Sequence, residues 1–113
     1  MKLTWAAGPT RPMNRTVRVL LRWLVSEPAS QSPRGPRFST PARFDHQGEN
    51  WTRDAWSLII TTAGTPDAKG QQFATARFLV PDAPHEWLSV GKRFTLFEGK
   101  PIAEGLVEEI LAD

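Results

Sequence analysis

The stretch from Arg15 to Val25 constrains the fold of this chain more than any other segment. Two sets of side chains alternate along it, a mainly apolar set (Val17, Val19, Leu21, Trp23, Val25) and a mixed set (Thr16, Arg18, Leu20, Arg22, Leu24). A period of two places successive side chains on opposite faces of an extended strand, whereas a helix repeats at about 3.6 residues. The segment therefore predicts a β-strand with one apolar face and with Arg18 and Arg22 on the other.

Turn residues divide the rest of the chain into further short strands. Five segments rich in apolar and β-branched residues lie between clusters of proline, glycine and polar residues: 38–44, 51–62, 72–80, 92–97 and 102–111. Six strands in a chain of 113 residues fit a single domain with one core. We therefore predict an all-β fold, a six-stranded antiparallel Greek-key barrel, with a sandwich as the alternative arrangement.

The domain is expected to span residues 15–113, after a flexible N-terminal leader over residues 1–14 that contains Gly8, Pro9 and Pro12. Glu27 to Pro36 is predicted to be a long loop, because its prolines cannot hold a regular ladder. Two alternatives stay open in the last strand. Gly105 indicates a bulge or a close backbone approach, and Leu106 to Leu111 also suits a short helix.

The composition removes several classes of function. Cysteine is absent, which excludes disulfides, thiolate nucleophiles and cysteine zinc sites, and a cytoplasmic location is the simplest expectation. The apolar run from Val17 to Val25 is interrupted by two arginines and is too short to span a membrane as a helix. His46 and His85 are expected to be solvated loop residues, so no metal, cofactor, small-molecule substrate or catalytic residue is predicted.

Basic residues gather in the first half of the chain. Residues 1–53 contain nine Lys or Arg and three Asp or Glu, whereas residues 54–113 contain five and nine. The predicted contact residues of this half are Arg18, Arg22, Arg34, Arg37 and Arg43, together with Arg15. If the long loop folds back on the first strand, these guanidinium groups form a cluster that suits phosphates or carboxylates. The alternative is that interleaved strands mix the charges over a solvated surface.

The chain has five tryptophans and no tyrosine. Trp23 and Trp56 follow the apolar phase of their segments and are expected in the core. Trp51 and Trp87 fall at the ends of strands, where an aromatic ring either caps the barrel or offers a flat surface to a partner.

The C-terminal third resembles a known family. Gly91-Lys92-Arg93-Phe94-Thr95-Leu96-Phe97-Glu98-Gly99 and the following Ile102 to Val107 resemble the last hairpin of the C-terminal β-barrel domain of translation elongation factor Tu. The resemblance extends to Arg15–Val25 as the first strand, Arg34–Ser39 as the next loop, and Ala74–Leu88 as the approach to the hairpin.

This resemblance implies a six-stranded antiparallel barrel without an active site, because the chemistry of that family belongs to a separate GTPase domain. The chain contains no Gly-x-x-x-x-Gly-Lys-Ser/Thr phosphate loop. In the family the barrel contacts the acceptor and T arms of transfer RNA and also protein partners. By position, Glu98 and Gly99 match the RNA-facing hairpin and Arg34 matches a basic loop position, while Phe97 replaces an arginine.

Together with these patterns, the resemblance implies a non-catalytic binding module, similar to the elongation factor Tu C-terminal barrel, that engages structured RNA similar to transfer RNA or the translation machinery. The alternative is a protein-binding module on the same barrel, such as an inhibitor, an antitoxin-like protein or an adaptor, with an acidic protein as its partner. Salt separates the two, because binding through several phosphates weakens steeply as the salt concentration rises.

Overall fold

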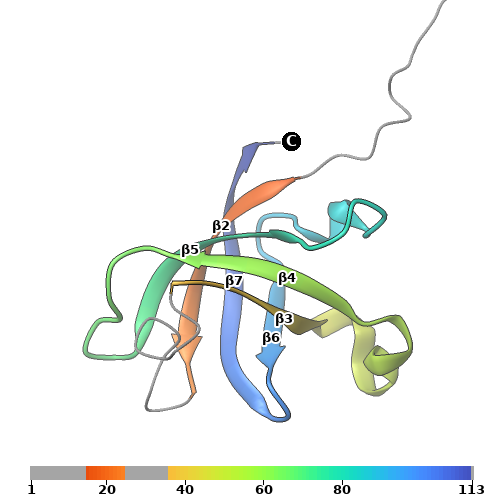
Figure 1. The fold of residues 1–113 in the computed structure, drawn as a ribbon, viewed down its shortest axis with the longest axis horizontal. Helices are drawn as coiled ribbons and strands as arrows, with labels where there is room; N and C mark the ends of the chain where they lie inside the picture. The colour runs from red at the N-terminus through yellow and green to blue at the C-terminus, as the bar shows by residue number, and fades with distance from the viewer. Residues whose placement is uncertain (1–14, 25–35, 113) are drawn as a thin grey trace, which may run out of the picture.

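The computed structural model describes residues 15–24 and 36–112, which form a closed antiparallel barrel of six strands (Figure 1). Around the barrel the order is β2, β5, β4, β3, β6 and β7, and β7 pairs with β2 to close it. The strands are β2 (Thr16–Trp23), β3 (Arg37–Phe44), β4 (Trp56–Thr62), β5 (Gln71–Phe78), β6 (Arg93–Phe97) and β7 (Pro101–Ala112). The prediction of a six-stranded all-β barrel is confirmed.

The connectivity is that of a Greek key. Strands β3, β4 and β5 follow one another in the chain and lie side by side, and β6 then returns to pair with the free side of β3. This gives the spatial order of a fourth strand beside the first of three consecutive ones. The leader at residues 1–14 and the part of the predicted loop before Pro36 lie outside the described residues.

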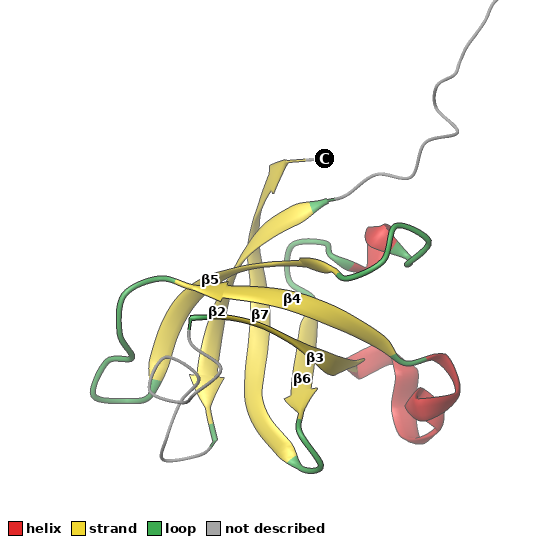
Figure 2. Ribbon diagram, in the orientation of Figure 1, coloured by secondary structure: helices red, strands yellow, loops and turns green. Residues whose placement is uncertain are grey.

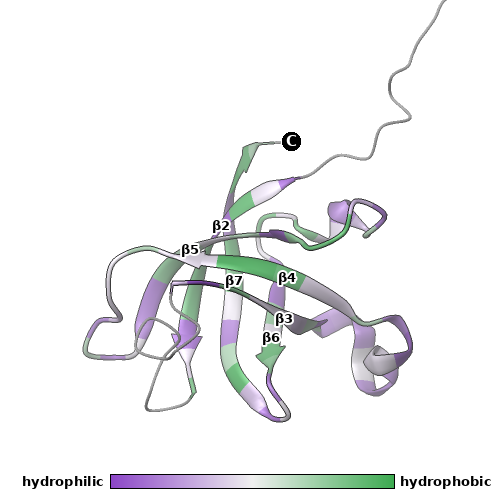
Figure 3. Cartoon of the chain, viewed as in Figure 1, coloured by the Kyte–Doolittle hydropathy of each residue, from purple (hydrophilic) through white to green (hydrophobic). Residues whose placement is uncertain are grey.

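The alternation that predicted β2 fills the barrel. Val17, Val19 and Leu21 are fully buried, whereas Arg18 and Arg22 are exposed. The hydropathy colouring shows hydrophilic stretches between hydrophobic ones along the strand (Figure 3). Every strand contributes to one core, whose largest fully buried side chains are Phe44, Phe78, Phe94, Leu21, Leu58, Ile60, Leu88 and Leu96. The barrel is therefore packed with side chains rather than hollow.

The connection between β3 and β4 is longer than predicted. Residues 51–55 were expected to begin a strand, but they continue a 3-10 segment, η3 (Asp45–Asp54), and β4 starts only at Trp56 (Figure 2). The side chain of Gln47 holds both ends of η3, because its Oε1 accepts from the Phe44 N–H at 2.8 Å and its Nε2 donates to the Asp54 carbonyl at 3.0 Å. These local bonds replace the ladder that an extended segment would have formed.

The second short helical segment, η4 (His85–Trp87), corrects the expectation for one histidine. His85 is buried, its ring lies edge-on to Phe78 at 5.7 Å, and its Nε2 lies 2.8 Å from the Pro81 carbonyl oxygen. The prediction of a solvated side chain is wrong here, because the chain folds back at Pro81 and seats the ring against the barrel. His46 is exposed, as predicted.

Strand β7 is continuous, which resolves the two alternatives left open by the sequence. Its second half pairs with β2, with Leu106 opposite Leu20, so it is not helical. Gly105 pairs with Phe94, and a Cβ atom at position 105 would overlap the Phe94 ring. The close approach is therefore made by an aromatic side chain rather than by backbone, and no shift of register occurs at Gly105.

Gly105→Ala is expected to destabilise the barrel by about 1–3 kcal/mol, because the new methyl group displaces the Phe94 ring. The free energy of unfolding from urea titration measures this cost. In a Phe94→Ala background the same substitution should cost nothing, since the overlapping ring is gone. An equal cost in both backgrounds would contradict the explanation.

Asp67, in the turn between β4 and β5, makes a pH-dependent contribution to the stability of the fold. Its Oδ1 accepts hydrogen bonds from the backbone N–H groups of Gln71 at 2.9 Å and Lys69 at 2.8 Å, and these lower the pKa of the carboxyl below its ordinary value of 3.8. A lowered folded-state pKa adds stability above pH 3.8 that is lost as the pH falls through the folded-state value. We expect Asp67→Asn to remove this part of the acid dependence of unfolding; an unchanged pH profile would refute it.

Candidate functional site

The barrel separates the predicted arginines into two groups. Arg18 and Arg22 lie on β2, whereas Arg37 and Arg43 lie on β3. Two strands stand between β2 and β3 in either direction around the barrel. The four side chains therefore do not form one cluster. Arg34 lies outside the described residues.

The arginines of β2 are paired with acids of the neighbouring strand β7. Arg18 Nη2 lies 3.2 Å from Glu109 Oε1, and Arg22 Nη2 contacts Glu104 Oε1. Arg18 also lies over the Phe73 ring, at 5.6 Å from its centroid. Because the basic first half and the acidic second half of the chain pair as adjacent strands, their charges mix on this face, as the alternative interpretation expected.

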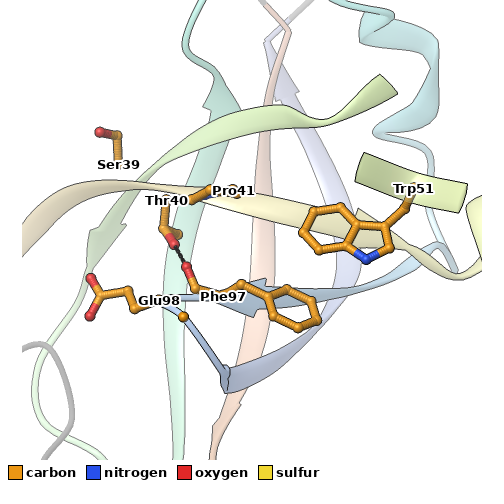
Figure 4. Close-up of a pocket in the computed structure, with 7 residues that line it drawn as sticks. Ser39, Thr40, Pro41, Trp51, Phe97 and Glu98 are labelled. Carbon is orange, nitrogen blue, oxygen red and sulfur yellow. Dashed lines mark hydrogen bonds between the residues drawn. The ribbon is translucent and has the colours of Figure 1, made fainter. Parts of the chain in front are cut away.

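Other predicted residues come together on the opposite side of the barrel. An open groove of about 450 Å³ runs between β3, η3 and the β6–β7 hairpin (Figure 4). It contains Glu98 and Gly99, the two hairpin residues singled out by the resemblance. We call it the aromatic groove; its lining residues are Ser39, Thr40, Pro41, Trp51, Phe97, Glu98 and Gly99.

Pro41 explains why the barrel wall opens here. The β3–β6 ladder pairs Phe44 to Ala42 with Phe94 to Leu96 and then stops, so Pro41 and Phe97 would have been the next pair. Proline has no N–H to donate to the ladder. The hydroxyl of Thr40 donates to the Phe97 carbonyl instead (Figure 4). Beyond this bond the two strands part, and the groove fills the space between them.

A pair of stacked aromatic rings forms one end of the groove. Trp51, carried by η3, lies on Phe97 with ring centroids 4.7 Å apart and planes inclined by 26° (Figure 4). The Arg43 guanidinium lies 5.4 Å from the Phe97 centroid. Both rings are only half-buried. Flat apolar surface of this kind is suited to contact with an apolar or aromatic side chain.

The remaining tryptophans serve the core. Trp23 is buried and donates from Nε1 to Gln72 Oε1 at 2.9 Å, which confirms its predicted place. Trp56 is partly buried against the core. Trp87 also packs against the core, edge-on to Phe44 at 5.4 Å and to His46 at 4.5 Å. Of the four tryptophans that the structure describes, Trp51 is thus the one that lies on the outer surface of the barrel.

Sequence reasoning missed the pairing of Trp51 with Phe97. The two residues are far apart in the chain. Trp51 was also predicted to lie in a strand, whereas β4 begins only at Trp56. A usable signal was present, however. A proline inside a strand-like segment such as 37–44 indicates a strand edge rather than the middle of a sheet.

The described residues of the groove supply mainly apolar and hydroxyl groups. Within residues 15–24 and 36–112 no three His, Asp or Glu side chains are close enough to hold a metal ion. No helix in this part of the chain is long and apolar enough to cross a membrane. The groove walls are ring faces, a proline, hydroxyls and one carboxylate, Glu98.

The structure is thus an antiparallel six-stranded barrel with an open groove on its outer wall. Comparisons of the chain with models of protein families, with curated proteins and with solved structures find no match. The resemblance to the C-terminal barrel of elongation factor Tu therefore stays a prediction.

The pairing of Arg22 with Glu104 can be tested by exchanging the charges. Arg22→Glu places two carboxylates on adjacent strands and should lower the free energy of unfolding by up to about 1 kcal/mol, because both side chains are about half-exposed. Arg22→Glu combined with Glu104→Arg should restore most of the loss. A double variant as unstable as the single one would show that the pair is not an interaction.

Proposed function

We propose that this chain is a non-catalytic protein-binding module that receives an apolar side chain of a partner protein in the aromatic groove. The observation that carries this proposal is the stacked Trp51–Phe97 pair, half-buried on the outer wall beside an open groove. Aromatic residues dominate the binding energy of protein interfaces. The groove volume of about 450 Å³ also lies within the usual range of ligand sites.

The same geometry favours a protein over RNA. Binding of nucleic acid depends on cations that neutralise several phosphates. Arg18 and Arg22 are each engaged by a glutamate of β7, and they face away from the groove on a strand across the barrel. Among the described residues that line the groove, the charged one is Glu98, an acid. Arg37 and Arg43 on β3 add two cations beside it, fewer than the several that phosphate binding needs. The alternative predicted from the sequence, a protein-binding module, is therefore the one we retain. A cytoplasmic location stays a prediction from composition.

Trp51→Ala tests the proposal. With the full chain as bait, ligands are selected from a display library of random peptides, and their affinity is measured by calorimetry. We expect Trp51→Ala to weaken the selected peptides at least about 30-fold, as truncation of a central aromatic residue does. Phe73→Ala is the matched control, since Phe73 is also exposed but lies on β5. Recovery of no peptide that depends on Trp51 overturns the proposal.

Bulk transfer RNA serves as the second probe. We expect no binding of transfer RNA that depends on Trp51. Tight binding to transfer RNA that falls steeply between about 50 and 200 mM salt would instead support the RNA-binding module, and it would replace the present proposal if no peptide binds.

A further inference from the structure

The edge of β3 beside the aromatic groove shows how a partner segment can be held, and this inference rests on the proposed function. The Thr62 N–H donates to the Pro36 carbonyl at 2.8 Å, so the backbone of Pro36 faces β4. In an antiparallel pair, the residues that face a given neighbour alternate along the strand. The β3–β4 register runs from Arg37 to Ala42 without a shift. The backbone groups of Arg37, Ser39 and Pro41 therefore face away from β4, and Ser39 and Pro41 are among the residues that line the groove.

No strand pairs with this side of β3 over Arg37 to Pro41 in the described part of the chain. The ladder with β6 covers only Ala42 to Phe44, because β6 has five residues and Pro41 ends the pairing. Arg37 and Ser39 thus each present an N–H donor and a carbonyl acceptor on this edge, Ser39 at the groove and Arg37 beyond it along β3. Unpaired donors and acceptors in register on an extended edge are a template for another strand.

The side chains of this edge add a second element of recognition. Arg37, Ser39, Pro41 and Arg43 share the outer face of β3, the face over which Trp51 and Phe97 stack. Among the described residues, neither Arg37 nor Arg43 has a carboxylate within ion-pair distance. An acidic side chain of a bound segment would therefore complement Arg37 at one end of the edge, while an apolar side chain would meet the stacked rings at the other.

We propose that the partner of this chain contributes an extended, acidic segment that adds to β3 as an extra strand at Arg37–Pro41. Its backbone pairs with Arg37 and Ser39, and alternate side chains of the segment face outward over the barrel wall. One of these is apolar and packs against Trp51 and Phe97. Another is a carboxylate that pairs with Arg37.

Amide hydrogen exchange of the free full chain tests whether the edge is open. Arg43 provides the internal reference, because it lies in the ladder opposite Thr95. The amides of Arg37 and Ser39 are expected to exchange at least about a hundredfold faster than that of Arg43, since local opening of an unpaired edge is nearly free. Equally slow exchange at Ser39 and Arg43 would mean that the edge is already occupied, and it would overturn the inference.

Two substitutions at Ser39 then test whether a ligand uses the edge. Ser39→Pro removes the N–H that faces the groove, whereas Ser39→Ala retains it and removes only the exposed hydroxyl. For the peptides selected on the full chain, we expect Ser39→Pro to weaken binding at least about tenfold and Ser39→Ala to leave it within about twofold. Equal effects of the two substitutions would show that the backbone donor is not used.

The combined results distinguish this inference from the proposed function. If Trp51→Ala abolishes binding but Ser39→Pro does not, the groove binds its partner and strand addition is wrong. If neither substitution matters, the proposed function itself fails. Should Ser39→Pro prevent folding, the same question is put to the peptide. Two versions of the peptide are compared, methylated at every second backbone nitrogen in opposite alternation. An added strand uses every second N–H, so one version should lose binding and the other should keep it. Loss of binding in both versions, or retention in both, rejects strand addition.

Discussion

Pairing of the first and last described strands, β2 and β7, is the interaction on which the rest of the structure depends. It runs the length of β2, from Thr16 to Trp23, and it closes the barrel. Closure pairs the otherwise open sides of these two strands and lets all six apolar faces enclose one core. The same pairing sets the basic β2 against the acidic β7, so the charge asymmetry of the sequence disappears from the folded surface on that side.

Closure is weakest where β3 meets β6. Three residue pairs join these strands, against eight between β2 and β7. Pro41 ends the short ladder, and the Thr40 hydroxyl satisfies the carbonyl of Phe97 that proline leaves without a donor. The Thr40–Phe97 hydrogen bond joins the two strands at this point, while in the described part of the chain no strand pairs with the rest of the β3 edge on that side. Local departures from regular pairing are where functional surfaces are expected in an otherwise consistent fold.

The sequence carried most of the fold and less of the site. Alternation of side chains is a local signal, and it located β2 within two residues at each end and placed Trp23 in the core. Three outcomes were not visible in the alternation of side chains. Gln47 holds η3 together where a strand was expected, and His85 is buried where the chain turns back at Pro81. The order of strands around the barrel separates Arg18 from Arg43. The first two rest on hydrogen bonds between side chains and nearby backbone groups, which follow no period, and the third depends on how distant strands pair.

Phe97 is the residue through which the fold bears on the proposed function. The resemblance to elongation factor Tu implies an arginine at this position of the hairpin, and an arginine there would suit phosphate. A phenylalanine on an outer wall instead has apolar faces to cover. Trp51 covers part of it and Arg43 lies over it, yet both aromatic residues stay partly exposed. Burying their remaining area against another protein is favourable, whereas a phosphate there would gain nothing from the apolar faces of the rings.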